Sequence, residues 1–108
     1  MNESISTLYN VILKRKTDVE EGSYTSYLFE KGTNKILKKV GEECTEVIIS
    51  CKEDNKKEQV NEICDLTYHL LVLMAQMEIS VEEISEELEK RSSKINNFKG
   101  ERKEITNI

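Results

Sequence analysis

The segment over residues 56–78 constrains the fold most, because apolar side chains cover almost its whole circumference when it is drawn as a helix. Such a helix must be largely buried, and one short chain has few other helices to bury it. Its one continuous polar seam has spacings of four, three and four, and consists of Glu58, Glu62, Asp65 and His69. A buried carboxylate normally takes up a proton or finds a cation, so this seam needs compensation.

The remainder of the chain is also predicted to be helical. It has no proline and only four glycines among 108 residues, a composition that favours helix over strand. Apolar spacing predicts helices over residues 4–16, 24–31, 34–53, 56–78 and 81–98. Ser23, Asn55 and Ser80 are the expected N-caps, and Gly32 is expected to end the second helix. We expect a single domain over residues 1–98 and a polar, frayed tail over residues 99–108.

Composition narrows the class of protein. Apolar residues make up 37% and charged residues 34% of the chain, which indicates a thin core and favours association between copies, here as a homodimer. The net charge of −5 argues against nucleic acid as a partner. No apolar stretch approaches the roughly 20 residues that span a bilayer, and no signal-peptide region occurs, so a cytoplasmic location is expected. The three cysteines lack paired spacing and are predicted to be small buried hydrophobic residues.

A second acidic pattern lies in the segment 34–53. Glu43 falls on the border of its apolar face and Glu46 one step further round, whereas Glu42 points nearly away from the core. Residues three apart share a helical face, so Glu43 with Glu46 and Glu62 with Asp65 form two pairs that antiparallel helices can bring together. Four carboxylates suit Mg²⁺, with Mn²⁺ as a substitute, and suit zinc poorly. Neighbouring lysines or arginines can neutralise the same acids instead.

These acids also lie within a family resemblance. It rests on residues 23–25, 28–32, 35–46, 62–66 and 68–73, where the carboxylates follow E-x-x-E and then E-x-x-D. Over residues 8–91 the sequence resembles the phosphoribosyl-ATP pyrophosphatases of histidine biosynthesis, within the MazG-like, all-α nucleotide pyrophosphatases. The resemblance implies a MazG-like bundle of about five helices, completed by dimerisation. It also implies Mg²⁺-dependent hydrolysis of phosphoribosyl-ATP to phosphoribosyl-AMP and pyrophosphate.

The acids then take roles that the resemblance implies. Glu43, Glu46, Glu62 and Asp65 are the expected metal ligands. A metal held there binds phosphate oxygens, offsets developing negative charge and lowers the pKa of the attacking water. Glu42, left uncoordinated, is expected to orient that water or to take its proton, so Glu42, Glu43 and Glu46 form the expected catalytic group.

Basic residues supply candidate substrate contacts. Lys35 and Lys39 lie on the ligand flank and are candidates for phosphate, although Lys39 can equally pair with Glu43 and Lys35 can be a plain solvated lysine. His69 either contacts the substrate or hydrogen-bonds across the bundle. Arg91, in a basic cluster of the last helix, either meets phosphates from a second subunit or belongs to a solvated face.

Two other functions remain open on the sequence alone. A MazG-like pyrophosphatase of ordinary or damaged nucleoside triphosphates would use the same four carboxylates with a different pocket for base and sugar. A helical interaction module without catalysis would use the acidic seams to bind basic side chains of a partner. The hydroxyls of residues 23–25 are interpreted as cap and packing groups.

Overall fold

The computed structural model describes residues 3–94 of the chain, and these residues form helices joined by short loops. The helices are α1 (Glu3–Thr17), α2 (Tyr24–Lys31), α3 (Thr33–Ser50), α4 (Lys56–Gln76) and α5 (Val81–Ser92). No strand occurs within this range, so the all-α class is confirmed. The predicted helix 81–98 is too long, because α5 ends at Ser92 and residues 93–94 form a turn. Residues 95–98 of that prediction and the tail over 99–108 lie outside the described residues.

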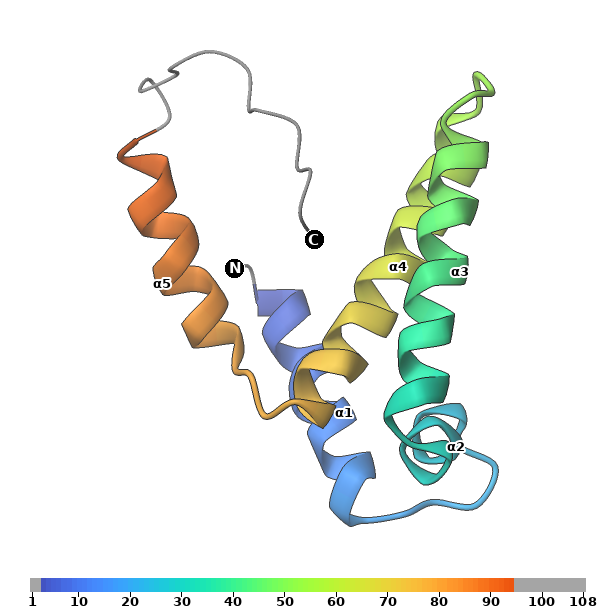
Figure 1. The fold of residues 1–108 in the computed structure, drawn as a ribbon, viewed down its shortest axis with the longest axis vertical. Coiled ribbons are helices and arrows are strands. Elements are labelled where there is room, and N and C mark those ends of the chain that lie inside the picture. The colour runs from blue at the N-terminus through green and yellow to red at the C-terminus, as the bar shows by residue number, and fades with distance from the viewer. Residues whose placement is uncertain (1–2, 95–108) are drawn as a thin grey trace, which may run out of the picture.

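Helices α3 and α4 form an antiparallel hairpin that runs along the longest axis of the structure (Figure 1). The short helix α2 packs at the base of α3, and α1 packs against α2 and α4. Helix α5 diverges from the hairpin on the side of α4, away from α3 (Figure 1). None of the helices between residues 3 and 94 has the length and apolar character needed to cross a membrane.

The helix starts follow their predicted caps. The side chain of Ser23 accepts a hydrogen bond from the amide of Ser26, and that of Asn55 accepts one from the amide of Glu58. Ser80 and Glu83 form a full capping box, in which each side chain accepts from the other's backbone amide. The starts of α2, α4 and α5 are therefore set by side-chain caps that can be recognised in the sequence.

The helix ends follow prediction less closely. Gly32 does end α2, with φ of +91° and ψ of −175°, a conformation that only glycine adopts readily. Helix α3 ends at Ser50 rather than residue 53, because residues 51–53 continue as a turn. Helix α4 ends at Gln76 rather than residue 78, because Glu78 adopts a left-handed φ of 60° and the Ile79 amide bonds the Met74 carbonyl oxygen at 2.8 Å.

The core is small, as the composition predicts. It consists of Tyr9, Ile12, Leu28, Ile36, Leu71, Val72, Ala75 and Val81. Two long-range hydrogen bonds tie α1 to the end of α4: the Tyr9 hydroxyl donates to the Ile79 carbonyl at 2.5 Å, and Lys16 Nζ donates to the Ala75 carbonyl at 2.9 Å. The base of the hairpin is thereby fixed, and this is the part of the molecule that positions the site.

The outer part of the hairpin is more exposed than predicted. Burial of the segment 56–78 was expected along its length, but its buried residues, His69, Leu71, Val72 and Ala75, all lie in its second half, while Val60 and Ile63 are 55% and 48% exposed. The physical reason is that no third helix covers the outer part of the hairpin within residues 3–94 (Figure 1). The prediction of buried cysteines is wrong for the single chain, because Cys44, Cys51 and Cys64 are all exposed.

Candidate metal centre

The α3–α4 hairpin brings three predicted ligands together. Carboxylate oxygens of Glu43, Glu62 and Asp65 all lie within 4.8 Å of one another. Mg²⁺ binds oxygen at roughly 2.0–2.1 Å, so two ligands on opposite sides of one ion lie about 4.2 Å apart. Adjacent ligands of one ion lie closer, about 3 Å apart, so the three carboxylates would share an ion after side-chain rotations that bring their oxygens up to about 2 Å nearer.

Glu46, the fourth predicted ligand, lies three residues after Glu43 on α3 and is not one of the three converging carboxylates. It borders a depression of about 210 Å³ that Glu58 and Glu62 also line. Glu46 is thus a neighbour of Glu62 and adds negative charge beside the centre. Of the two predicted pairs, Glu62 and Asp65 therefore both reach the cluster, whereas only Glu43 of the other pair does.

The electrostatics of Glu62 show how concentrated this charge is. Its pKa is raised above the ordinary value, first by burial and then by a hydrogen bond with Glu58. The negative charges of Asp65, Glu58 and Glu46 raise it further. Mutual repulsion of this kind is what a bound cation relieves, so the donor set fits a hard divalent ion.

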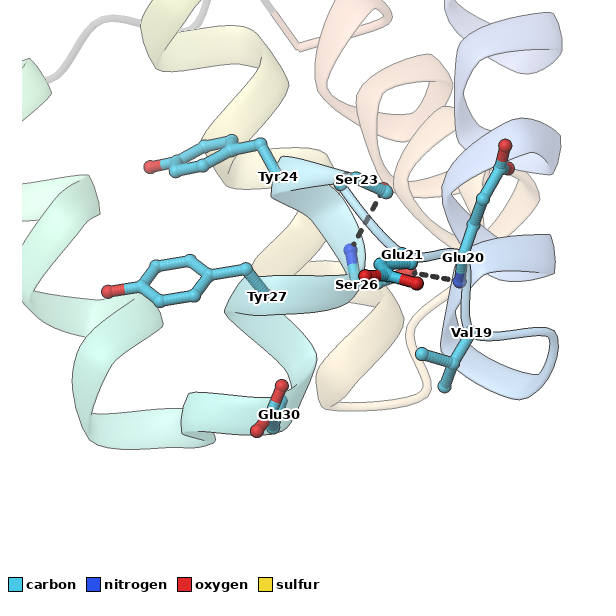
Figure 2. Close-up of a pocket in the computed structure, with 9 residues that line it drawn as sticks. Val19, Glu20, Glu21, Ser23, Tyr24, Ser26, Tyr27 and Glu30 are labelled. Atoms are coloured by element: carbon cyan, nitrogen blue, oxygen red, sulfur yellow. Dashed lines mark hydrogen bonds between the residues drawn. The ribbon is translucent and has the colours of Figure 1, made fainter.

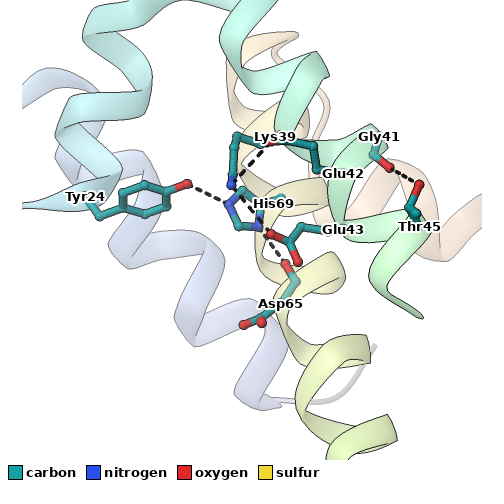
Figure 3. Close-up of polar contacts among 8 residues, drawn as sticks. All are labelled: Tyr24, Lys39, Gly41, Glu42, Glu43, Thr45, Asp65 and His69. Atoms are coloured by element: carbon teal, nitrogen blue, oxygen red, sulfur yellow. Dashed lines mark hydrogen bonds and ion pairs between the residues drawn. The ribbon is translucent and has the colours of Figure 1, made fainter. Parts of the chain in front are cut away.

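Lys39 occupies the edge of the centre, where its ammonium is paired with two acids (Figure 3). Lys39 Nζ lies 3.5 Å from Glu42 Oε1 and 3.7 Å from Glu43 Oε1. Burial works against the lysine's charge, but Tyr24 and the two carboxylates outweigh it and raise the pKa of Lys39. The pairing with Glu43 that the sequence left open is therefore present, and it keeps a positive charge beside the carboxylates.

His69 is buried, and both of its ring nitrogens are hydrogen-bonded inside the protein (Figure 3). Nδ1 lies 2.7 Å from the Asp65 carbonyl oxygen, which can only accept, so Nδ1 carries a proton. Nε2 is hydrogen-bonded to the Tyr24 hydroxyl at 3.0 Å. The hydrogen bond across the bundle is therefore present, and His69 links α2 to the backbone of a predicted ligand.

Aromatic rings surround this histidine, and sequence reasoning missed their arrangement. The ring of Tyr24 stacks with those of Tyr27 and Tyr68 at centroid distances of 6.0 and 6.2 Å. Tyr68 is hydrogen-bonded to Thr25, which confirms a packing role for one of the hydroxyls of residues 23–25. Tyr27 was not singled out at all, although its spacing of three from Tyr24 on α2 was the signal available.

Of the two remaining basic candidates, Lys35 lies on the same helix as Lys39, whereas Arg91 lies on α5. Lys35 is half-buried on α3, one turn before Lys39 on the same side of the helix. Arg91 lies on α5, where its side chain is 73% exposed and Nε lies 3.2 Å from Glu87 Oε2. Because α5 leads away from the hairpin, a single chain does not bring Arg91 to the carboxylates (Figure 1).

The fold and the site define an all-α protein with a cluster of carboxylates between two antiparallel helices. The family described as Phosphoribosyl-ATP pyrophosphohydrolase matches residues 5–92. Proteins named Phosphoribosyl-ATP pyrophosphatase are similar over nearly the whole chain. That of Clostridium acetobutylicum is 61% identical over 107 residues, which is 99% of this chain and 97% of the relative. That of Listeria innocua is 55% identical over 104 residues, 96% of this chain and 99% of the relative. The chain belongs to the phosphoribosyl-ATP pyrophosphohydrolase family.

Proposed function

We propose that this protein hydrolyses phosphoribosyl-ATP to phosphoribosyl-AMP and pyrophosphate in histidine biosynthesis, and that it uses Mg²⁺ to do so. The family and the relatives' name support the reaction. The observation that supports the metal is the convergence of Glu43, Glu62 and Asp65, whose oxygens lie within 4.8 Å of one another. Such an oxygen-only donor set suits Mg²⁺ or Mn²⁺.

The residues of the hairpin divide the work. Glu43, Glu62 and Asp65 would hold the ion, and Glu46, which lines a depression together with Glu62, would be the fourth ligand. The bound ion supplies charge compensation at the phosphates and a more acidic water. Glu42 is exposed at the edge of the centre, where it can orient the attacking water or accept its proton.

Lys39 is the group best placed to bind the substrate's phosphates. Its Nζ lies 3.5 Å from Glu42 Oε1 and 3.7 Å from Glu43 Oε1, so the ammonium is held at the edge of the carboxylate cluster, where it can turn toward a phosphate oxygen. Lys35, one turn earlier on α3, extends the same positive flank. His69 serves the site through its hydrogen bonds with Tyr24 and the Asp65 backbone.

A second copy of the chain is the proposed partner. An apolar groove runs between α1, α3, α4 and α5, and it includes Leu37, Leu70 and Met77, which are 46%, 40% and 50% exposed. The small core of the single chain leaves these side chains uncovered, and a homodimer would bury them. The net charge of −5 disfavours nucleic acid as a partner, and we propose a cytoplasmic location for the protein.

Pyrophosphate release from phosphoribosyl-ATP tests this proposal. The assay is run beside ATP, dUTP and dCTP, each with and without Mg²⁺. We expect turnover of phosphoribosyl-ATP far above that of the other nucleotides, and only with the metal. Comparable rates across the panel would instead favour a general nucleoside triphosphate pyrophosphatase, and no release from any nucleotide would favour the non-catalytic interaction module.

A further inference from the structure

Helix α2 presents two large aromatic side chains that the core does not use. Tyr24 and Tyr27 are 45% and 38% exposed, and their rings are stacked with an interplanar angle of 24°. Both rings extend from α2 to the same side, away from Val19 and Glu20 of the preceding loop (Figure 2). A continuous, exposed aromatic surface of this kind is well suited to a planar ligand.

This surface adjoins the carboxylate centre at one end. The Tyr24 hydroxyl is bound to His69, whose ring is bound in turn to the backbone of Asp65. Tyr24 also lies close enough to Lys39 and Glu43 for their charges to affect the pKa of its hydroxyl, which burial raises. A nucleotide whose phosphates lay at Lys39 and the carboxylates could therefore reach these rings with its base, which is one sugar further on.

A separate positive charge lies at the other end of the surface. Lys31 Nζ lies 5.7 Å from the centroid of the Tyr27 ring. Within residues 3–94 no carboxylate pairs with Lys31, in contrast to Lys39 with its two acids. The side chain of Lys31 is exposed and flexible, so it can move off the ring when a base arrives and bind an anion beside it.

We propose that Tyr24 and Tyr27 form the surface on which the substrate's purine stacks, and that Lys31 binds the phosphate of its phosphoribosyl group. This inference rests on the proposed function, because phosphoribosyl-ATP carries two separate phosphate groups, the triphosphate and the phosphate of the added sugar. The order of Lys39, the two rings and Lys31 along the surface matches triphosphate, base and second phosphate. Lys31 thereby distinguishes phosphoribosyl-ATP from ATP.

Two substitutions test the two halves of the proposal. Tyr27→Leu should raise the KM for phosphoribosyl-ATP and the Kd for ATP roughly tenfold to a hundredfold, because base stacking on an aromatic ring is lost. It should leave the Kd for inorganic pyrophosphate, which has no base, unchanged. Tyr27→Phe keeps the ring and should restore most of the lost affinity. Lys31→Met should raise the KM for phosphoribosyl-ATP without changing the Kd for ATP, whereas Lys14→Met on α1 should change neither.

Calorimetry with Mg²⁺ present measures the two Kd values independently of turnover, so the binding surface is tested even if the reaction is not the one proposed. Absence of pyrophosphate release from phosphoribosyl-ATP by the unaltered protein would overturn the proposed function. An unchanged Kd for ATP in Tyr27→Leu, or an equal weakening of ATP and pyrophosphate binding, would overturn the stacking surface. An equal effect of Lys31→Met on phosphoribosyl-ATP and ATP would overturn the assignment of Lys31.

Discussion

Gly32 joins α2 to α3 and thereby sets where the tyrosines of α2 lie relative to the carboxylates of α3. Its φ of +91° with ψ of −175° lies in a region that is essentially restricted to glycine. A Cβ built at this position meets nothing within 4 Å, so a substitution would act through the backbone alone. We predict that Gly32→Ala destabilises the protein without any steric clash.

The size of this effect follows from the same geometry. A residue with a Cβ held in that region costs about 1–3 kcal/mol. Gly41 provides a matched control, since a Cβ there also meets nothing within 4 Å, but the residue lies inside α3 with ordinary helical φ. Gly41→Ala should stabilise the protein by about 1 kcal/mol, because alanine is the better helix former.

Thermal unfolding followed by circular dichroism measures both changes. The predicted separation of the variants is roughly 2–4 kcal/mol, which places their midpoints on the order of 10–20 °C apart in a domain of this size. Gly32→Ala should melt below the unaltered protein and Gly41→Ala above it. A Gly32→Ala variant as stable as the unaltered protein would refute the argument from backbone strain at the α2–α3 junction.

Three further predictions concern the metal, the end of α4 and the apolar groove. Mg²⁺ at ten times its Kd should stabilise the fold by about 1.4 kcal/mol through mass action, seen as a higher melting temperature, and a melting curve indifferent to millimolar Mg²⁺ would contradict the site. Glu78→Gly should stabilise the protein by about 1 kcal/mol in urea unfolding, since glycine adopts the left-handed conformation at this helix end without strain; a loss of stability would contradict that reading. Leu70→Asp should convert the proposed dimer to a monomer by light scattering, and a monomeric unaltered protein would refute the proposed dimer.

The helix starts could be predicted from the sequence because their causes are local. Ser23, Asn55 and Ser80 each bond a backbone amide three residues further on, and that chemistry is visible in a few letters of sequence. The end of α4 could not be predicted in the same way. Glu78 takes the left-handed position that glycine usually fills, and only the hydrogen bond between Ile79 and Met74 reveals it.

The sequence predicted more burial of residues 56–78 than the structure shows, because a helical pattern does not determine what covers an apolar face. The wheel of residues 56–78 is apolar almost all round, yet Val60, Ile63 and Cys64 are exposed in the single chain. The missing cover is a tertiary or quaternary property. The same argument applies to α5, whose orientation away from the hairpin decides where Arg91 lies and has no local signal in the sequence (Figure 1).

The candidate site was predictable as far as helical periodicity reaches. Spacing of three placed Glu62 and Asp65 on one face, and the antiparallel hairpin places Glu43 opposite them. Periodicity does not determine the rotamer or the axial shift between two helices, which is why Glu46 lies beside Glu58 and Glu62 and is not one of the three converging carboxylates. The edge-to-face contact of the Tyr24 ring with His69 joins α2 to α4, and such a contact between two helices is again beyond a local pattern.

The central claim is that carboxylates of the α3–α4 hairpin hold the ion needed to release pyrophosphate from phosphoribosyl-ATP. Pyrophosphate release in Mg²⁺ by Glu62→Gln tests it most directly, with Glu86→Gln on α5, an exposed residue outside the cluster, as the matched control. Mutation of a residue that only hydrogen-bonds to a metal ligand typically lowers activity about tenfold to a hundredfold. Loss of a ligand itself should therefore lower kcat/KM by about a hundredfold or more. We predict that loss in Glu62→Gln, with an unchanged helical circular dichroism spectrum, and ordinary activity in Glu86→Gln. Undiminished pyrophosphate release by Glu62→Gln would contradict the carboxylate centre.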